Sequence, residues 1–270
     1  MDTIYKQADE FMTDILTIAS TIPAKVSTIT IAITTASKGF DLTKILEEFD
    51  TSEIKDFIYD VTGAKDSIVV SNKKKFSNSI IFKCNNIPTE EDGYVLLKQA
   101  VKVFCNGSLH ITGVKDIKDA IYLAEVFLTM LELMYGGDGL SHMFAITGFE
   151  VQLMNFYFKL PSMLNGFVLQ LVEVRNCLRQ TTNYSVSYNN ERHAGVIIRS
   201  PTFSLLVFDT GNVILCSIKD SSQLREAKDF IEDKILLLPD QYSIKKECIT
   251  CNKQRKEDKA FDYANYLVLK

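Results

Sequence analysis

The hydrophobic pattern of the chain predicts a similar series of strands in each of its two halves. Each half begins with a run in which apolar and polar residues alternate, Val26 to Thr35 and Val151 to Leu160, as is typical of a half-buried strand. Further strands are predicted at 67–70, 79–83, 100–105 and 109–113 in the first half, and at 183–188, 195–199, 204–208 and 213–217 in the second.

Two helices are predicted in each half, one short and one long. The short helices follow the first strands, at 41–49 and at about 165–175. Asp41 is placed to cap the first of them, because its carboxylate can accept hydrogen bonds from the free N–H groups of the first turn. The long helices, 114–135 and 221–238, end each half.

Comparison of the two halves reveals an internal repeat. Residues 103–116 read VFCNGSLHITGVKD, and residues 207–220 read VFDTGNVILCSIKD. The shared residues are separated by the same 104 positions: Phe104 and Phe208, Gly107 and Gly211, Lys115 and Lys219. The two glycines stand where a tight hairpin turn requires a positive φ. We infer a duplication.

The repeat divides the chain into five segments. They are an amphipathic N-terminal extension (1–24), a first repeat (25–136), a glycine-containing linker (137–149), a second repeat (150–238) and a C-terminal tail (239–270). Two such repeats most simply pair into one long antiparallel sheet with helices on one face. The other face is left open, so we expect the functional side chains there.

The two long helices differ in their apolar surfaces. The helix from Ser221 has a clean apolar stripe opposite a charged face, whereas residues 117–135 are apolar nearly all round. The outer face of this helix therefore needs a cover. The candidates are the N-terminal segment with Ile4, Phe11, Ile15 and Ile18, the tail with Tyr263 and Tyr266 to Leu269, a second copy of the chain, or a partner protein.

Composition and charge exclude several classes of protein. With 46% hydrophobic and 24% charged residues, the chain has the composition of a globular protein. Its N-terminus lacks the features of a signal peptide, and Glu125 and Glu132 interrupt its most apolar stretch, so we expect a soluble, intracellular protein. The net charge of −4 argues against a protein that coats nucleic acid by charge alone.

No catalytic, metal or cofactor site is expected. Among six cysteines only Cys248 and Cys251 form a C-x-x-C pair, and no second pair completes a zinc site. The three histidines, His110, His142 and His193, have no serine or cysteine in a recognisable nucleophile frame. The sequence therefore predicts a protein that is not an enzyme.

Several segments resemble the TATA-box-binding protein (TBP) family. They are VSTITI at 26–31, FDL at 40–42, YNNERHAGVIIR at 188–199 and the hairpin at 204–217. With the duplicated order of elements, the resemblance covers about residues 25–238 and is greatest to divergent members encoded by large DNA viruses. It implies an α+β fold, a duplicated saddle in which a long curved antiparallel sheet carries helices on its convex face.

The resemblance also implies a DNA-binding surface. Family members kink DNA with phenylalanines that wedge between base steps of the minor groove. The positions that match the wedges are Phe76, Phe104, His193 and Phe208. Those that match the groove floor are Lys102, His110, Thr112, Leu206, Ile214 and Cys216. Lys83 and Arg199 match phosphate-contacting positions, and Asn155 is the nearest match to a base-reading asparagine.

Partners and location follow from the same resemblance. A loop containing Glu191 matches the loop that is expected to recruit a transcription factor IIB-like protein, and with it the RNA polymerase machinery. The first repeat departs from the pattern by an insertion at about 85–97 and by Lys102 and His110 in place of aliphatic residues. The implied function is binding and bending of AT-rich promoter DNA, in the nucleus or a cytoplasmic viral replication compartment. The alternative is an interaction scaffold of the same fold that does not itself bind DNA.

Overall fold

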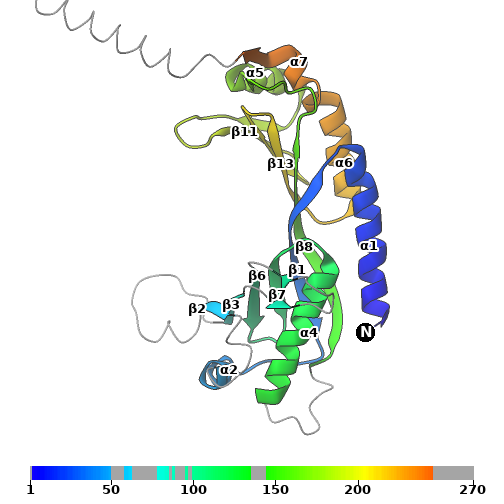
Figure 1. The fold of residues 1–270 in the computed structure, drawn as a ribbon, viewed down its shortest axis with the longest axis vertical. Helices are drawn as coiled ribbons and strands as arrows, with labels where there is room; N and C mark the ends of the chain where they lie inside the picture. The colour runs from blue at the N-terminus through cyan, green and yellow to red at the C-terminus, as the bar shows by residue number, and fades with distance from the viewer. Residues whose placement is uncertain are drawn as a thin grey trace, which may run out of the picture. The chain divides into compact units, whose positions relative to one another are not determined.

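The computed structural model describes residues 2–49, 58–62, 78–84, 87–88, 95–96, 99–134 and 144–245 (Figure 1). Its helices are α1 (Asp2–Thr21), α2 (Leu42–Phe49), α4 (Ile117–Met134), α5 (Leu171–Thr181), α6 (Ser221–Phe230) and α7 (Leu238–Tyr242), and a π-helical turn covers Ile231–Ile235. The strands are β1 (Lys25–Thr35), β2 (Ile58–Thr62), β3 (Ser79–Cys84), β4 (Ile87–Pro88), β5 (Val95–Leu96), β6 (Gln99–Phe104), β7 (Leu109–Val114), β8 (Ile146–Lys159), β9 (Phe167–Leu169), β10 (Ser185–Ser187), β11 (Gly195–Arg199), β12 (Ser204–Phe208), β13 (Asn212–Ile218) and β14 (Ser243–Lys245).

Ten of these strands form a large antiparallel sheet, in the order β10-β11-β12-β13-β8-β1-β7-β6-β3-β2. The expected α+β class with a large antiparallel sheet is therefore confirmed. The predicted strand at 67–70, the tail beyond Lys245 and the Cys248–Cys251 pair lie outside the described residues.

The chain divides into two compact units. Unit 1 comprises residues 1–158, 200–204 and 214–230, and unit 2 comprises residues 159–199, 205–213 and 231–270.

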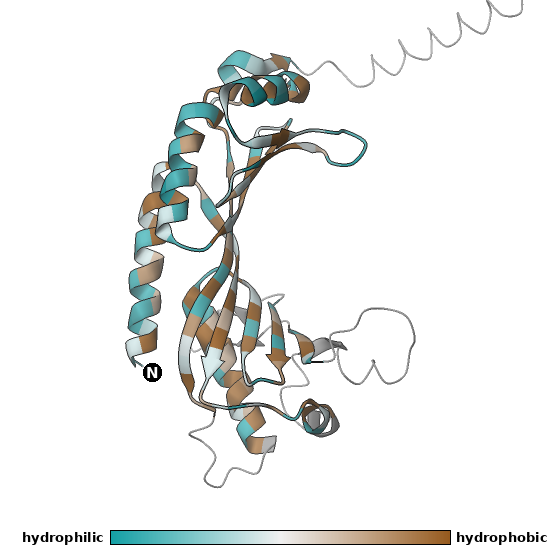
Figure 2. Cartoon of the chain, turned by 180° about the vertical axis from the view of Figure 1, so that it is seen from behind, coloured by the Kyte–Doolittle hydropathy of each residue, from teal (hydrophilic) through white to brown (hydrophobic). Residues whose placement is uncertain are grey.

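In unit 1 one face of the strands packs on helices. Side chains alternate between the two faces of a strand, and Ile29, Ile31 and Ile33 of β1 are fully buried. Helix α4 lies on this face, in contact with β1 and β7. Phe127 of α4 packs on Phe82 of β3, with the ring centroids 5.5 Å apart. Figure 2 shows hydrophobic and hydrophilic positions alternating along the strands.

Helix α1 provides the cover that the apolar surface of α4 requires. It lies alongside both α4 and α6 (Figure 1). Its buried residues are Ala8, Met12, Ile15, Ile18 and Ala19, whereas Ile4 and Phe11 are only half-buried. Of the covers considered from the sequence, the N-terminal segment is thus the one that contacts α4 in the described part of the chain.

Three polar contacts fix the position of α1 in unit 1. Asp9 pairs with Lys118 of α4, and Asp14 pairs with Arg225 of α6 at 2.8 Å. The Tyr5 hydroxyl donates a hydrogen bond of 2.8 Å to the Glu125 carboxylate of α4. Because both ion pairs are about half exposed, each stabilises by less than about 1 kcal/mol. Burial of the apolar residues, at about 1.5–3 kcal/mol for a large side chain, is the larger contribution.

The two hairpins turn in the same way, as the glycine positions predicted. Gly107 and Gly211 have φ values of +90° and +78°. The N–H of Gly107 donates to the Phe104 carbonyl at 3.1 Å, and that of Gly211 donates to the Phe208 carbonyl at 3.0 Å. Each phenylalanine therefore ends its strand immediately before a tight turn.

Substitution of Gly107 by alanine is expected to lower the free energy of unfolding by at least about 2 kcal/mol, from the left-handed conformation and a steric clash together. A Cβ atom there would lie 2.5 Å from the carbonyl oxygen of Ser37, which is backbone and cannot swing aside. Gly148→Ala is the matched control, because a Cβ atom there meets nothing within 4 Å. Urea denaturation measures both variants, and similar losses in the two would contradict the argument.

Two helices begin directly after an aspartate that caps their first turn. Asp41 caps α2 as predicted, accepting hydrogen bonds from the N–H groups of Thr43 and Lys44 at 3.0 and 3.1 Å. Asp220 caps α6 in a similar way, through the N–H of Gln223 at 2.9 Å. This hydrogen bond, with that from the Ser222 hydroxyl, lowers the pKa of Asp220.

Two predicted helices in the second half were placed wrongly. The short helix expected at 165–175 begins instead at Leu171, because β9 occupies Phe167–Leu169 and pairs with β14. The long helix expected at 221–238 ends at Phe230, where a π-helical turn begins. The N–H of Leu236 bonds the carbonyl of Ile231, five residues earlier, at 2.9 Å. Pro239, which has no N–H, lies in the first turn of the separate helix α7.

Candidate nucleic-acid interface

The open face of unit 1 is the face of its strands opposite α4, defined here by Thr30, Lys102, Phe104, His110 and Thr112. These side chains are half-buried or exposed and alternate with buried ones along β1, β6 and β7. The strand register pairs Lys102 with His110, and Thr30 with Thr112. The Thr30 hydroxyl donates to that of Thr112 at 3.3 Å. The resemblance implied that four of these residues belong to a DNA-binding surface, namely Lys102, Phe104, His110 and Thr112. All four lie on this one face.

Three of these residues form a cluster at the end of the first hairpin, β6–β7. The Lys102 ammonium lies 4.6 Å from the centroid of the Phe104 ring, within the range of a cation–π interaction. The His110 ring lies on the same phenylalanine, with its centroid 4.7 Å away. The Phe104 ring therefore contacts both a cation and an imidazole.

The environment of His110 lowers the pKa of its imidazole and so favours the neutral form. Burial lowers its pKa, and the positive charge of Lys102 lowers it further, while Glu150 has the opposite effect. A neutral imidazole has one N–H donor and one nitrogen acceptor. This side chain can therefore both give and receive a hydrogen bond.

One further predicted residue of the first repeat, Lys83, lies outside this cluster. Lys83 is half-buried on β3, between the fully buried Phe82 and Cys84. Burial raises the pKa of the Cys84 thiol to about 12, so this cysteine is unreactive at neutral pH. Phe76, the expected first wedge, lies outside the described residues.

In unit 2 the two predicted wedges of the second repeat lie together. The rings of His193 and Phe208 have centroids 6.1 Å apart and planes inclined by 36°. Gly195 allows the Phe208 ring to lie close to the backbone of β11, because a Cβ atom there would lie 2.9 Å from the Val207 carbonyl oxygen and 3.3 Å from the Phe208 ring. Its N–H also donates to His193 Nδ1 at 3.1 Å, which orients the imidazole.

The floor residues of the second hairpin, β12–β13, are apolar and half-buried. In unit 2, Leu206 lies between the fully buried Leu205 and Val207. In unit 1, Ile214 and Cys216 alternate with buried residues on β13. Burial raises the pKa of the Cys216 thiol, which is therefore uncharged at neutral pH.

The remaining predicted residues take different positions. Arg199, at the end of β11 in unit 2, is exposed. Asn155, on β8 in unit 1, accepts a hydrogen bond from the Ser217 N–H at 3.4 Å through its side-chain oxygen. Ser217 itself has a φ of +72°. The structure thus shows a contact between the Asn155 side chain and the backbone of a residue 62 positions later, which its sequence position did not suggest.

Glu191 lies in the loop between β10 and β11 of unit 2. Its side chain is exposed, and its N–H donates to the Asn189 side-chain oxygen at 3.0 Å. The carbonyl of Asn189 accepts hydrogen bonds from the N–H groups of Arg192 and His193. Asn189 therefore organises a turn that presents Glu191 to solvent.

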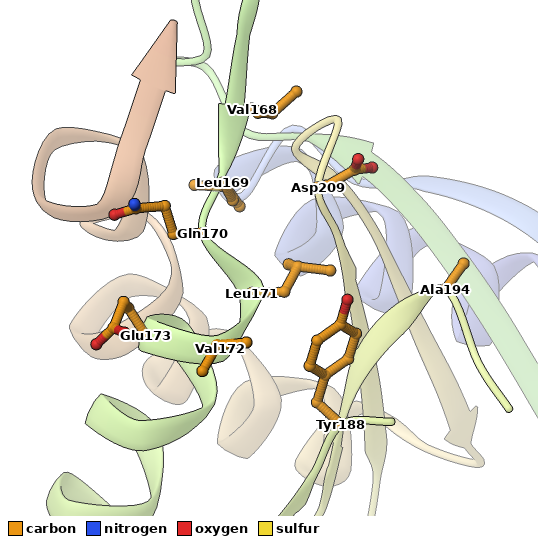
Figure 3. A pocket seen from close by; sticks show the side chains of 9 residues that line it. All are labelled: Val168, Leu169, Gln170, Leu171, Val172, Glu173, Tyr188, Ala194 and Asp209. Carbon is orange, nitrogen blue, oxygen red and sulfur yellow. The ribbon is translucent and has the colours of Figure 1, made fainter. Parts of the chain in front are cut away.

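Sequence reasoning missed a pocket of about 370 Å³ in unit 2. Its lining is shown in Figure 3 and comprises Val168, Leu169, Gln170, Leu171, Val172, Glu173, Tyr188, Ala194 and Asp209. The two charged residues are both acidic, so the pocket would repel a phosphate. No sequence signal marked it, because its lining comes from β9, α5 and two loops that are distant along the chain.

Metal-binding clusters and membrane-spanning helices are both absent among the described residues. Within them, no group of three or more His, Cys, Asp or Glu side chains could hold a metal ion. None of their helices is long and apolar enough to cross a membrane.

Comparison with known proteins places the fold. Among solved structures, the TBP of Methanococcus jannaschii matches with a TM-score of 0.52 at 16% sequence identity, over 78% of this chain and 97% of that one. The chain therefore has a TBP-like fold, as the resemblance implied. Residues 163–236 match the family model described as transcription factor TFIID (or TATA-binding protein, TBP).

The other comparisons add little. A complex of A. aeolicus tRNASec with M. kandleri SerRS matches with a TM-score of only 0.27 at 15% identity, over 80% of this chain and 30% of that one. This likeness is too low to support an argument. No curated protein matches the sequence of the chain.

Proposed function

We propose that the protein is a TBP-like transcription initiation factor that binds and bends AT-rich promoter DNA through the minor groove. The observation that carries the proposal is the placement of one phenylalanine at the end of each hairpin. Phe104 and Phe208 both leave their strands immediately before a glycine turn, and neither is buried in the core. A side chain in that position can insert between base steps, which kinks the duplex.

The neighbours of the two phenylalanines support this role. Each has a second ring beside it, His110 in unit 1 and His193 in unit 2. Unstacking a base step costs a few kcal/mol, which is offset by the larger contact with bent DNA. Arg199 and Lys83 would contact phosphates, and the match of residues 163–236 to the TBP family model supports the same class of ligand.

The proposal includes the partners implied by the resemblance. The exposed Glu191 loop would bind a transcription factor IIB-like protein and so the RNA polymerase machinery. The same proposal holds that the chain is most similar to divergent TBP-family members encoded by large DNA viruses. It also places the protein in the nucleus or in a cytoplasmic viral replication compartment.

A second candidate function is an interaction scaffold of the same fold without DNA binding of its own. The acidic net charge of −4 favours it, because fewer cations mean weaker binding to phosphates. The polar pair Lys102 and His110, in place of an apolar floor, favours it as well.

Fluorescence energy transfer between the ends of a short duplex tests the proposal. Wild-type protein is expected to raise the transfer on AT-rich DNA and much less on GC-rich DNA, at low and at physiological salt. The Phe104→Ala/Phe208→Ala variant is expected to lose most of this rise, because the wedges that open the base steps are gone.

The matched control is Phe11→Ala, which removes a half-buried phenylalanine from α1 instead of a hairpin. It is expected to bend DNA like the wild type. No binding to either duplex at either salt concentration would reject the DNA-binding proposal in favour of the scaffold.

A further inference from the structure

The two hairpins present different chemistry at corresponding positions. In the first, Lys102 and His110 form a cross-strand pair, and Thr112 follows on the same face. The residues 104 positions later, in the second hairpin, are Leu206, Ile214 and Cys216. The first hairpin thus has hydrogen-bond donors and acceptors at positions where the second hairpin has aliphatic groups and a neutral thiol.

The minor groove distinguishes base pairs mainly by one group. A·T and T·A pairs present only acceptors there, whereas a G·C pair adds the N2 amino group of guanine as a donor. An aliphatic floor pressed against that amino group buries a donor without a partner, which costs binding free energy. A floor with an acceptor can satisfy it.

The polar pair of the first hairpin lies beside its wedge. Both the Lys102 ammonium and the His110 ring are within 5 Å of the Phe104 ring centre, at 4.6 and 4.7 Å. These groups would therefore meet the base pairs next to the step that Phe104 opens. The imidazole can accept from a guanine amino group or donate to an acceptor of an A·T pair, and the ammonium can donate to acceptors of either pair.

We propose that the two hairpins read different base pairs: the second selects A·T, whereas Lys102 and His110 let the first accept G·C as well as A·T. This inference rests on the proposed binding of the minor groove. It predicts a recognition site that is strictly AT-rich at one end only.

A base-pair scan tests the inference on the wild-type protein. Each A·T pair of a short AT-rich duplex is replaced in turn by G·C or by inosine·C, and the Kd is measured by fluorescence anisotropy. Inosine lacks the N2 amino group, so it separates the minor-groove effect from other effects of the replacement. We expect G·C to raise the Kd about tenfold or more in one half of the contacted site and less than about threefold in the other. Replacement by inosine·C is expected to change the Kd little in either half of the site.

Exchange of the floor residues assigns the two halves to the two hairpins. In the Lys102→Leu/His110→Ile variant, the G·C penalty is expected to appear in both halves of the site. In the reciprocal Leu206→Lys/Ile214→His variant, the rise in Kd caused by G·C is expected to be less than about threefold in both halves of the site. Circular dichroism checks that each variant is folded. If one variant fails to fold, the other variant and the wild-type scan test the inference.

The outcomes separate the inference from the proposed function. An equal G·C penalty in both halves of the wild-type site, or penalties that the exchanged residues leave unchanged, would overturn the inference while DNA binding stands. Absence of binding to any duplex would reject both.

Discussion

Replacement of Ile15 by aspartate is expected to lower the free energy of unfolding of unit 1 by at least about 4 kcal/mol. The Ile15 side chain is fully buried on the helix that packs against α4 and α6. The change removes a large apolar group from that contact and puts a carboxylate in its place. Removal of a buried aliphatic side chain alone costs about 2–5 kcal/mol, and a buried charge without a partner adds to this. Urea denaturation followed by circular dichroism measures the loss.

The adjacent residue provides a matched control. Leu16 is 48% exposed on the same helix, so Leu16→Asp makes a comparable chemical change one position away. Its effect is expected to stay within about 1 kcal/mol. Equal effects at the two positions would mean that α1 does not pack on unit 1 through the face that carries Ile15.

A negative charge on the second hairpin is expected to have the largest effect on DNA binding. Ile214→Glu places a carboxylate beside Cys216 on the open side of β13. Juxtaposed like charges cost several kcal/mol at an interface, so we expect the Kd for an AT-rich duplex to rise at least about a hundredfold. Fluorescence anisotropy at a fixed salt concentration measures the change.

The control for this variant carries the same change in net charge. Gln180 is exposed on α5, on a helix and not on the proposed DNA-binding strands. Gln180→Glu is expected to change the Kd by less than about threefold. If both variants weaken binding equally, the loss reflects net charge and not the position of Ile214.

The elements that the sequence predicted well depend on short-range chemistry. The capping by Asp41 and the positive φ of Gly107 and Gly211 need only residues within one turn. The helix expected at 165–175 was misplaced for the opposite reason. Its first residues belong to β9, whose partner β14 lies more than seventy positions later, so the local pattern could not reveal the pairing.

In the candidate site, too, some features were predicted from the sequence and others depend on contacts between distant residues. The resemblance to the TBP family placed Lys102, His110 and Thr112 on one surface, and in the structure all three lie on one face of β6 and β7. The contacts of Lys102 and His110 with Phe104 depend on the register of the hairpin, which could not be read from the sequence alone. The hydrogen bond from the Ser217 backbone to Asn155 joins residues 62 positions apart. No local pattern indicates such a contact.

Helix α1 has a consequence for how the chain is made. It is synthesised before both of the helices on which it packs, and Asp14 pairs with Arg225, 211 residues later. At about 5–20 residues per second, a ribosome needs roughly 10–40 s to produce that partner after α1 has been made. During this interval the apolar face of α1 has α4 as its earliest partner and cannot complete its packing on α6. The nascent chain is therefore exposed to chaperones and to aggregation for longer than a protein of the same size with mainly local contacts.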